Sequence, residues 1–214
     1  MTPLFVKICG ITRQQDADLA VGLGASALGF VFWPGSPRSV PTQAAASIAA
    51  LVPPHVMKVG VFVDEAVERV VRAVDDVGLE AVQLHGSETP EYCRQLIALL
   101  AKGEGQTRVI KSFGLKDNGG VVSCSDFDSD VLCLVDAYDP ARHGGTGRTA
   151  NWDSAREIAA TRPTILAGGL NAANISLAIR LVRPYGVDVS SGVESAPGVK
   201  EPIRLRSFFE ALHG

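Results

Sequence analysis

The chain has 214 residues, of which 46% are hydrophobic and 20% are charged, enough apolar mass for one domain with a sizeable core. Its net charge of −3 gives no electrostatic footprint for nucleic acid or anionic lipid. No run approaches the roughly 18–20 apolar residues of a membrane-spanning helix, and the first residues lack the apolar region of a signal peptide. These features disfavour secreted, membrane-bound and disordered proteins, so we expect neither a nucleic-acid nor a membrane partner.

The four cysteines, at positions 9, 93, 124 and 133, do not form a disulfide framework, and no two of them have C-x-x-C spacing. We therefore expect free thiols in a reducing compartment, which predicts a cytoplasmic protein. Three of them, Cys93, Cys124 and Cys133, are interpreted as small apolar fillers of the core. Cys9 differs because it ends the first apolar run.

Short apolar runs recur along the chain at intervals of roughly 22 to 33 residues. They are continuous and rich in Val, Ile, Leu and Phe, which is typical of strands buried on both faces of a parallel sheet. The eight predicted strands span residues 4–9, 27–32, 58–63, 81–85, 107–111, 131–136, 164–167 and 187–190.

Helical patterns lie between these runs. The valines from 67 to 77 repeat at i, i+3 and i+4 after Asp64, a candidate N-cap, and Gly78 supplies a stop. Thr89 followed by Pro90 predicts a second helix start, and Thr12 with Gln15 has the spacing of a capping box. Asn171 is a candidate cap for the helix that carries Ile175. Only the segment 116–130 argues against a long helix, because it contains a glycine pair.

Eight strand–helix units predict an α/β fold, a single (β/α)₈ TIM barrel spanning residues 1–214. The rival is a doubly wound open sheet, which normally has five to seven strands. No G-x-G-x-x-G follows the first strand, and no linker or low-complexity tract marks a domain boundary. At 214 residues the chain is close to the minimum for a barrel, which leaves no length for a cofactor domain.

Catalytic groups of such barrels lie at the C-terminal ends of the strands, so polar residues at those ends are candidates. Cys9 ends the first strand, where a helix N-terminus would lower the pKa of a thiol and favour a thiolate base. Lys7 points to the same side of the strand; it either assists Cys9 or forms an ion pair inside the barrel. Asp136 ends the sixth strand, and a carboxyl in a partly desolvated pocket suits a general acid.

Glycine-rich segments follow the last three strands and predict a phosphate site. Glycines let backbone amides converge on an anion, and barrels often bind phosphate with the loops after strands 7 and 8. The segments are GGTG at 144–147, AGGL at 167–170 and SSGVE at 190–194, and their candidate binding residues are Gly145, Gly147, Gly168, Gly169, Ser190, Ser191 and Gly192.

Three further residues are candidates for substrate binding. Arg38, in the SPR segment after the second strand, has the fork geometry to bind a carboxylate. His85 either contacts substrate or makes an internal hydrogen bond, and Asp188 either orients a polar substrate group or caps the last helix. The sequence contains no H-E-x-x-H, cysteine–histidine cluster or acidic metal set, so no metal is expected.

Along nearly its whole length the chain resembles the phosphoribosylanthranilate isomerase family of tryptophan biosynthesis. Each matching segment is short, but their joint order is highly specific. They are KICGIT at 7–12, GFVFWPGSPRSV at 29–40, VGVFV at 59–63, VQLHG at 82–86, DAY at 136–138, GGTG at 144–147, ILAGGLNAANI at 165–175 and GVDVSSGVE at 186–194.

The resemblance implies a cofactor-free (β/α)₈ barrel that catalyses an Amadori rearrangement of N-(5′-phosphoribosyl)anthranilate. The product is 1-(2-carboxyphenylamino)-1-deoxyribulose 5-phosphate. By this resemblance the general base falls on Cys9, the general acid on Asp136, the arginine that holds the anthranilate carboxylate on Arg38, and the phosphate on the three glycine-rich loops. The charged insert at 139–143 and Asn151, where an aspartate is common, depart from the family pattern.

The sequence also allows three other functions to be considered. The histidine-pathway aldose–ketose isomerase shares the barrel but resembles a strand-1 aspartate enzyme, whereas this chain has Cys9. A ribulose-phosphate epimerase needs metal-binding histidines at strand ends, and only His85 lies at one. A non-catalytic phosphate-binding barrel would be expected to have lost Cys9 or Asp136, and both are present.

Overall fold

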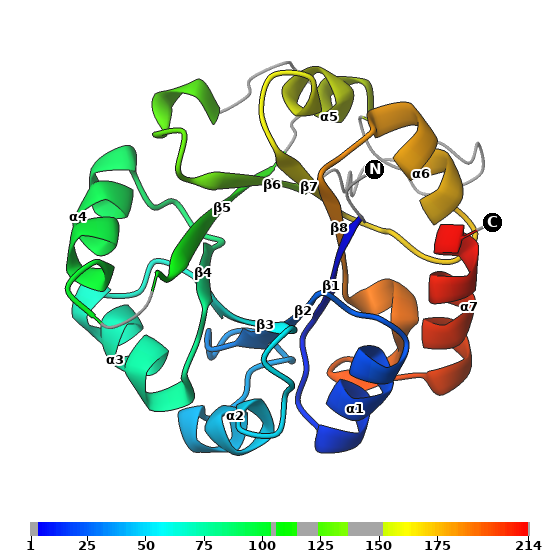
Figure 1. Cartoon of the computed structure of the whole chain (residues 1–214), viewed down its shortest axis with the longest axis horizontal. Helices are drawn as coiled ribbons and strands as arrows, with labels where there is room; N and C mark the ends of the chain where they lie inside the picture. Colours follow the sequence, from blue (N-terminus) through cyan, green and yellow to red (C-terminus); the bar gives the residue numbers. More distant parts are fainter. Residues whose placement is uncertain (1–3, 104–105, 115–123, 137–151, 214) are drawn as a thin grey trace.

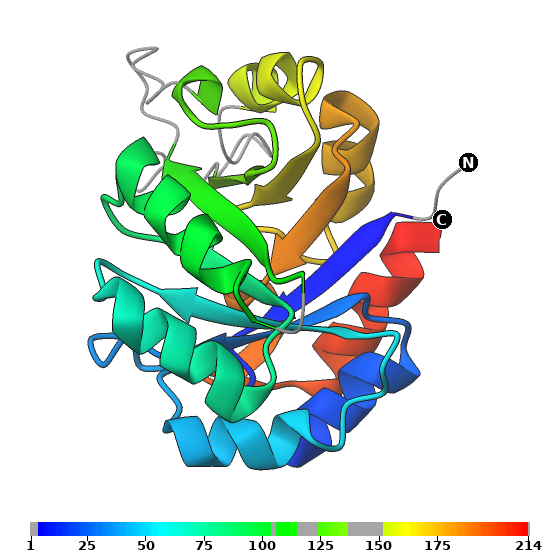
Figure 2. The same ribbon diagram turned by 60° about the vertical axis from the view of Figure 1, so that its left-hand side comes forward.

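Eight parallel strands close into a barrel in the order β1 to β8, in a computed structural model that describes residues 4–103, 106–114, 124–136 and 152–213. Figure 1 shows the helices as a ring around these strands, and Figure 2 shows the strands inclined across the molecule. The strands are β1 Phe5–Cys9, β2 Ala27–Val31, β3 Met57–Phe62, β4 Ala81–Leu84, β5 Arg108–Gly114, β6 Leu132–Asp136, β7 Thr164–Ala167 and β8 Gly186–Val189. The predicted (β/α)₈ barrel and all eight predicted strands are therefore confirmed, with β5 running three residues further than predicted.

Seven α-helices are present among the described residues: α1 Gln14–Gly22, α2 Thr42–Ala49, α3 Val67–Val77, α4 Pro90–Leu100, α5 Trp152–Ala159, α6 Ile175–Val182 and α7 Pro202–His213. Among the residues described between β5 and β6, Cys124–Asp126 form a 3₁₀ turn. Most of the segment 116–130 discussed in the sequence analysis lies outside the described residues. A small two-stranded sheet, β9 Glu194–Ala196 and β10 Val199–Lys200, follows β8.

Helix ends test the predicted caps. Gly78 ends α3 in the left-handed conformation, with φ 70°, and the Thr89 hydroxyl accepts a hydrogen bond from the backbone N–H of Tyr92 at the start of α4, both as predicted. The caps predicted at Asp64 and Thr12 are wrong. The Asp64 carboxylate instead accepts from the backbone N–H of Ser87, and the Thr12 hydroxyl donates to the carbonyl of Gly198. Both side chains find distant partners that local spacing cannot reveal.

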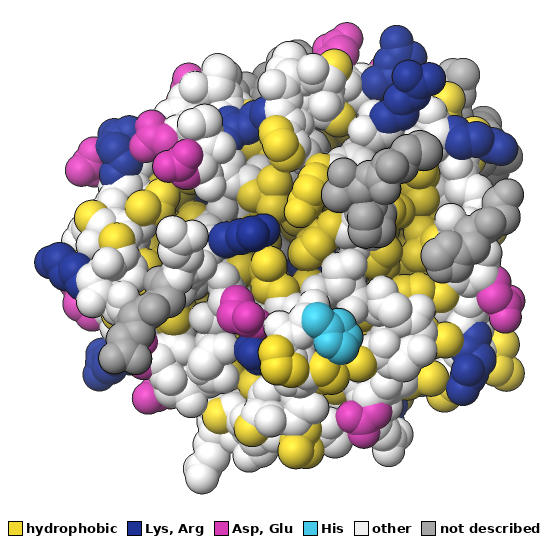
Figure 3. Space-filling model, in the orientation of Figure 1, with side chains coloured by type: hydrophobic (Ala, Val, Ile, Leu, Met, Phe, Trp, Pro, Cys, Tyr) yellow, Lys and Arg dark blue, Asp and Glu magenta, His cyan; other side chains and the backbone are white. Residues whose placement is uncertain are grey.

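Apolar side chains fill the barrel in layers, because alternate residues of each strand point inward. In one layer, the partly buried side chains of Phe5, Met57 and Leu132 pack against small and branched buried residues. In the orientation of Figure 1, hydrophobic side chains gather over the middle of the molecule (Figure 3). Nearer the C-terminal ends of the strands, Cys9 packs with Val31 and Val61. A reactive group therefore lies directly on the apolar core.

Within the described ranges, none of the helices combines the length and the apolar character that crossing a membrane requires.

Closure of the barrel depends on the absence of a side chain at Gly186. This residue pairs with Phe5 of β1 on one side and with Ile165 of β7 on the other. A Cβ at Gly186 would lie 2.6 Å from the carbonyl oxygen of Phe5, and backbone cannot move away cheaply. We expect Gly186→Ala to lower the free energy of unfolding in urea by about 1–3 kcal/mol.

A matched control is Gly22→Ala at the end of α1, where a Cβ would meet nothing within 4 Å. Alanine there should leave stability unchanged or raise it by about 0.5–1 kcal/mol. Equal effects of the two substitutions would contradict the role assigned to Gly186.

Candidate active site

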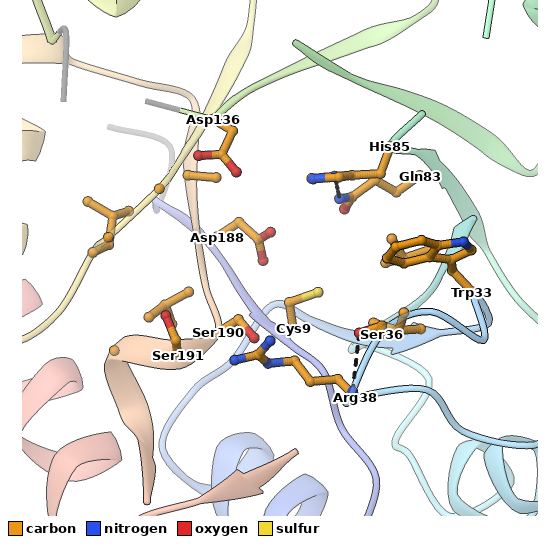
Figure 4. Close-up of a pocket in the computed structure, with 18 of the residues that line it drawn as sticks. Cys9, Trp33, Ser36, Arg38, Gln83, His85, Asp136, Asp188, Ser190 and Ser191 are labelled. Atoms are coloured by element: carbon orange, nitrogen blue, oxygen red, sulfur yellow. Dashed lines mark hydrogen bonds between the residues drawn. The ribbon is translucent and has the colours of Figure 1, made fainter. Parts of the chain in front are cut away.

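A cavity of about 530 Å³ opens at the C-terminal ends of the barrel strands. Every predicted site residue that the structure describes lines it: Cys9, Arg38, His85, Asp136, Gly168, Gly169, Asp188, Ser190, Ser191 and Gly192. In Figure 4, Cys9, Asp136 and Asp188 face His85 and Trp33 across this cavity, while Arg38 closes its lower side. The structure thus brings together side chains that are up to 183 residues apart in the chain, as the positions of Cys9 and Gly192 show. Gly145 and Gly147 lie outside the described residues.

Cys9 ends β1, and a glycine on the neighbouring strand β2 leaves space for its side chain. Its register partner on β2 is Gly29, where a Cβ would lie 2.9 Å from the Cys9 sulfur and 3.1 Å from the Lys7 Nζ. A side chain at position 29 would therefore displace both groups. Sequence reasoning missed this role because an isolated glycine in a strand does not reveal what it faces.

Lys7 forms a buried ion pair with Asp188. The two residues are register partners on β1 and β8, and the Lys7 Nζ donates to the Asp188 carboxylate over 2.9 Å. The exposed fractions of the two side chains are 0% and 9%. Burial acts to lower the pKa of Lys7, but Asp188 and Cys9 outweigh it and raise that pKa, so the ammonium stays charged. The ion pair predicted for Lys7 inside the barrel is confirmed, and it does not exclude the other prediction, that Lys7 assists Cys9.

The pKa of the Cys9 thiol is raised, contrary to the lowering expected from a helix N-terminus. Burial is the main cause and the Asp188 carboxylate adds to it, while the ammonium groups of Lys7 and Lys200 oppose it. Helix α1 begins only at Gln14, so its N-terminal dipole is not adjacent to the thiol. Two lysines, rather than a helix, supply the positive charge that favours a thiolate here.

His85 is held in a neutral form. The Gln83 amide nitrogen donates to its Nδ1 over 3.0 Å, which leaves the ring proton on Nε2. Burial lowers the pKa of His85, although Asp136 and Asp188 act in the opposite direction. In Figure 4 the ring points into the cavity, so Nε2–H can donate to a ligand there. Gln83 lines the cavity, and its Oε1 atom is buried without a hydrogen-bond partner in the described structure.

Arg38 reaches the cavity from the loop after β2 and is already bound to a carboxylate. Its Nε and Nη2 atoms donate to Glu194 over 2.7 to 3.1 Å. Lys200 donates to the same Glu194 carboxylate over 2.8 Å. The sequence analysis assigned no role to Glu194 or Lys200; Glu194 belongs to a quoted motif, but its partner Arg38 is 156 residues away.

The loops after β7 and β8 form the glycine-rich end of the cavity. Gly168 and Gly169 both have positive φ, 93° and 63°, a conformation that glycine adopts without strain. A Cβ at Gly192 would lie 1.8 Å from the carbonyl oxygen of Leu170, so the two loops meet only because position 192 lacks a side chain. The Ser190 hydroxyl is buried and has no hydrogen-bond partner in the described structure, which leaves it free for a ligand.

Helix α6 begins later than predicted. Its first residue is Ile175, and Asn174 rather than Asn171 occupies the position before it. The Asn174 side chain accepts a hydrogen bond from the backbone N–H of Asn171 over 2.9 Å, within the five residues between Gly169 and the helix.

Asp136 ends β6 and is half-buried at the cavity wall. In Figure 4 its carboxylate points into the same space as that of Asp188. Among the described residues, no group of three or more His, Cys, Asp or Glu side chains is placed to hold a metal ion.

A closed eight-stranded barrel with a thiol, two carboxylates and an imidazole at its mouth defines the class of protein, a (β/α)₈-barrel enzyme. Residues 6–211 match the family model described as N-(5′phosphoribosyl)anthranilate (PRA) isomerase. The chain therefore belongs to the N-(5′-phosphoribosyl)anthranilate isomerase family.

Relatives and solved structures agree with this assignment. The isomerase of that name from Pelobacter propionicus is 48% identical to the chain, and the match covers 95% of this chain and 92% of the relative. The one from Trichlorobacter lovleyi is 49% identical, and the match covers 95% of each chain. The crystal structure of phosphoribosyl anthranilate isomerase from Thermotoga maritima has a TM-score of 0.84 at 38% identity, covering 99% of this chain and 100% of that one. Another, solved in complex with reduced 1-(o-carboxyphenylamino)-1-deoxyribulose 5-phosphate, has a TM-score of 0.81 at 36% identity and the same coverage.

Because Lys7 and Asp188 act on the pKa of the Cys9 thiol in opposite directions, replacing either of them should shift that pKa. Lys7→Met removes a positive charge that lowers the pKa of Cys9 and leaves the opposing Asp188, so we expect thiolate to form at higher pH. Asp188→Asn removes a charge that raises this pKa, so its titration should move to lower pH. Thiolate absorbance near 240 nm, corrected with a Cys9→Ser variant, measures both shifts. Shifts of the same sign in the two variants would contradict the electrostatic account.

Proposed function

We propose that this chain catalyses the Amadori rearrangement of N-(5′-phosphoribosyl)anthranilate with Cys9 as general base and Asp136 as general acid. The product is 1-(2-carboxyphenylamino)-1-deoxyribulose 5-phosphate, formed in tryptophan biosynthesis. One observation carries this assignment of roles: a thiol at the end of β1 and a carboxylate at the end of β6 face a common cavity. That cavity has an arginine on one side and two glycine-rich loops on another.

The first step opens the furanose ring. Asp136 donates a proton to the ring oxygen, the bond from this oxygen to C1′ breaks, and the nitrogen lone pair forms the C=N bond of a Schiff base. The half-buried position of the carboxyl, at the cavity wall, suits proton transfer to a bound ligand.

The second step moves the proton from C2′. The Cys9 thiolate removes it, and the C–H electron pair forms the C1′=C2′ bond of an enolamine, which neutralises the nitrogen. The enolamine then gains a proton at C1′ and loses the proton of its C2′ hydroxyl, which gives the ketone. Lys7 and Lys200 favour the thiolate needed for this step, against the burial that raises the pKa of the thiol.

Two remote groups of the substrate fix it across the cavity. The phosphate is assigned to the loops after β7 and β8, with Gly168, Gly169, Ser190, Ser191 and Gly192, because backbone N–H groups and serine hydroxyls suit an anion. The anthranilate carboxylate is assigned to Arg38. Binding at both ends holds C2′ and the ring oxygen near their catalytic groups, an entropic advantage for the reaction.

His85 and Asp188 lie between these ends. The neutral His85 ring directs its Nε2–H into the cavity and is assigned to a ribose hydroxyl. Asp188 keeps Lys7 beside the thiol and presents its remaining oxygen to the ligand. Gly145 and Gly147 stay assigned to the phosphate by the sequence alone.

We further propose that the ligand is a small phosphosugar–anthranilate conjugate and that the enzyme works in the cytoplasm. The complex of a 36% identical family member with a reduced product supports the first statement. The four free, buried thiols support the second, since a reducing compartment keeps thiols in this form.

Cys9→Ser tests the base. Serine keeps the shape of the side chain but is a far weaker base at neutral pH, so we expect turnover to fall by at least about 100-fold with substrate binding retained. The loss of anthranilate-type fluorescence as substrate is consumed measures the rate. Cys93→Ser, at a buried thiol outside the cavity, is the control and should keep normal turnover. Near-normal turnover of Cys9→Ser would remove Cys9 as the base, and no turnover by the unmodified protein would refute the proposed reaction.

Arg38→Ala tests carboxylate binding. Loss of the only charge assigned to the anthranilate carboxylate should raise KM at least about tenfold, a loss of roughly 1.4 kcal/mol or more, and change kcat less. The steady-state rate at several substrate concentrations separates the two constants. An unchanged KM would place the carboxylate elsewhere in the cavity.

A further inference from the structure

We propose that Glu194 is a positioning residue for substrate recognition: held by Lys200, it fixes the Arg38 guanidinium so that its terminal N–H edge faces the substrate carboxylate. This inference rests on the proposed function, because it concerns the anthranilate carboxylate of that substrate. It assigns a role to the buried Glu194 carboxylate, which takes no part in the proton transfers of the proposed reaction.

The contact between Arg38 and Glu194 is a side-on fork. Nε of Arg38 donates to Glu194 Oε1 over 3.0 Å and to Oε2 over 3.1 Å, and Nη2 donates to Oε2 over 2.7 Å. A guanidinium is planar and carries five N–H donors. This side-on fork occupies the Nε–Nη2 edge and leaves the two N–H bonds of Nη1, with the second of Nη2, for another acceptor. Those remaining donors form an end-on edge that matches a second carboxylate.

Glu194 can orient Arg38 because it is itself fixed. Its side chain is only 3% exposed, whereas that of Arg38 is 23% exposed at the cavity. Lys200 Nζ donates to Glu194 Oε1 over 2.8 Å, and the backbone N–H of Gly198 donates to the same oxygen over 3.3 Å. The partly exposed arginine is thus held by a carboxylate that is itself buried and hydrogen-bonded.

Lys200 connects this carboxylate to the rest of the site. Its fully buried Nζ also donates to the backbone carbonyls of Cys9 and Ser190. One ammonium therefore joins the strand end that carries the base, the loop assigned to phosphate, and the residue that holds Arg38. Gly10 completes the arrangement, since a Cβ there would lie 2.7 Å from the Arg38 Cδ.

The charges of the cluster favour an anionic ligand. Arg38 and Lys200 contribute two positive charges and Glu194 one negative charge, so a single positive charge remains next to the cavity. Burial acts to raise the pKa of Glu194, but hydrogen bonds from Arg38 and Lys200 outweigh it and lower that pKa. Glu194 is therefore ionised at neutral pH, and a substrate carboxylate would complete two pairs of opposite charges.

The test compares two stable ligands on the full-length enzyme. One is the reduced product, which carries the carboxylate; the other is the same molecule with phenyl in place of carboxyphenyl. In Glu194→Gln the amide presents donors to the guanidinium and breaks the fork. We expect the Kd of the carboxylate ligand to rise by up to about 100-fold, while that of the phenyl ligand stays within about twofold of the unmodified enzyme. In the steady state, KM should rise more than kcat falls.

Glu80→Gln is the matched control, because Glu80 forms an ion pair with Lys58 away from the cavity and is 43% exposed. It should leave both Kd values unchanged. Equal weakening of both ligands in Glu194→Gln would overturn the proposal in favour of a merely structural role. Tighter binding of the carboxylate ligand would also overturn it, since Glu194 would then compete with the substrate.

Arg38→Lys provides a second test that leaves Glu194 intact. A lysine keeps the charge and can bond Glu194 but has no planar second edge, so the preference for the carboxylate ligand should be lost. A retained preference would show that charge alone suffices and would overturn the proposal even if Glu194→Gln did not fold. Failure of the proposed function is distinguishable, because the unmodified enzyme would then show no preference for the carboxylate ligand.

Discussion

The buried ion pair between Lys7 and Asp188 is the interaction on which the site depends. It joins the first and last strands of the barrel at register-paired positions, so the contact exists only when the barrel is closed. Both side chains are almost fully buried, and removing one partner of such a pair leaves an uncompensated charge, a loss of about 3–5 kcal/mol. The same ammonium lies beside the Cys9 thiol and lowers its pKa. Closure of the fold and the basicity of the thiol therefore share one interaction.

A second set of charged side chains, Lys200, Glu194 and Arg38, also lies close to Cys9. Lys200 binds the Cys9 carbonyl and the Glu194 carboxylate, and Glu194 binds Arg38. A thiolate in an apolar setting needs nearby positive charge, and both Lys7 and Lys200 act to lower the pKa of Cys9. Gly29 leaves room for the thiol and the Lys7 side chain, and Gly10 leaves room for the side chain of Arg38. In the proposed reaction this positive charge lets a thiol surrounded by protein act as the base.

Much of the fold follows from the sequence because its signals are local. Continuous apolar runs predict strands buried on both faces, and helix-spaced valines with Gly78 predict α3. The strand ends then place Cys9, Asp136 and Asp188 at one rim without any knowledge of contacts.

The parts of the site that the sequence did not predict depend on contacts between residues far apart in the chain. Glu194 meets Arg38 across 156 positions, and Lys200 meets Cys9 across 191, so no spacing rule relates them. The pKa of Cys9 differs from the sequence-based expectation for the same reason: Thr12 does not cap a helix beside the thiol, because its hydroxyl donates to the carbonyl of Gly198. Short-range patterns predict elements well, whereas the pKa of a buried group depends on every charge packed around it.

A crystal structure with the reduced product bound tests the account most directly, because it places all the proposed groups against one ligand. The account predicts the Cys9 sulfur within about 3.5 Å of the ligand C2′. It also predicts the Arg38 end-on edge on the ligand carboxylate while the side-on edge remains on Glu194. A ligand bound with its carboxylate at the loops after β7 and β8, or with C2′ turned away from the sulfur, would contradict it.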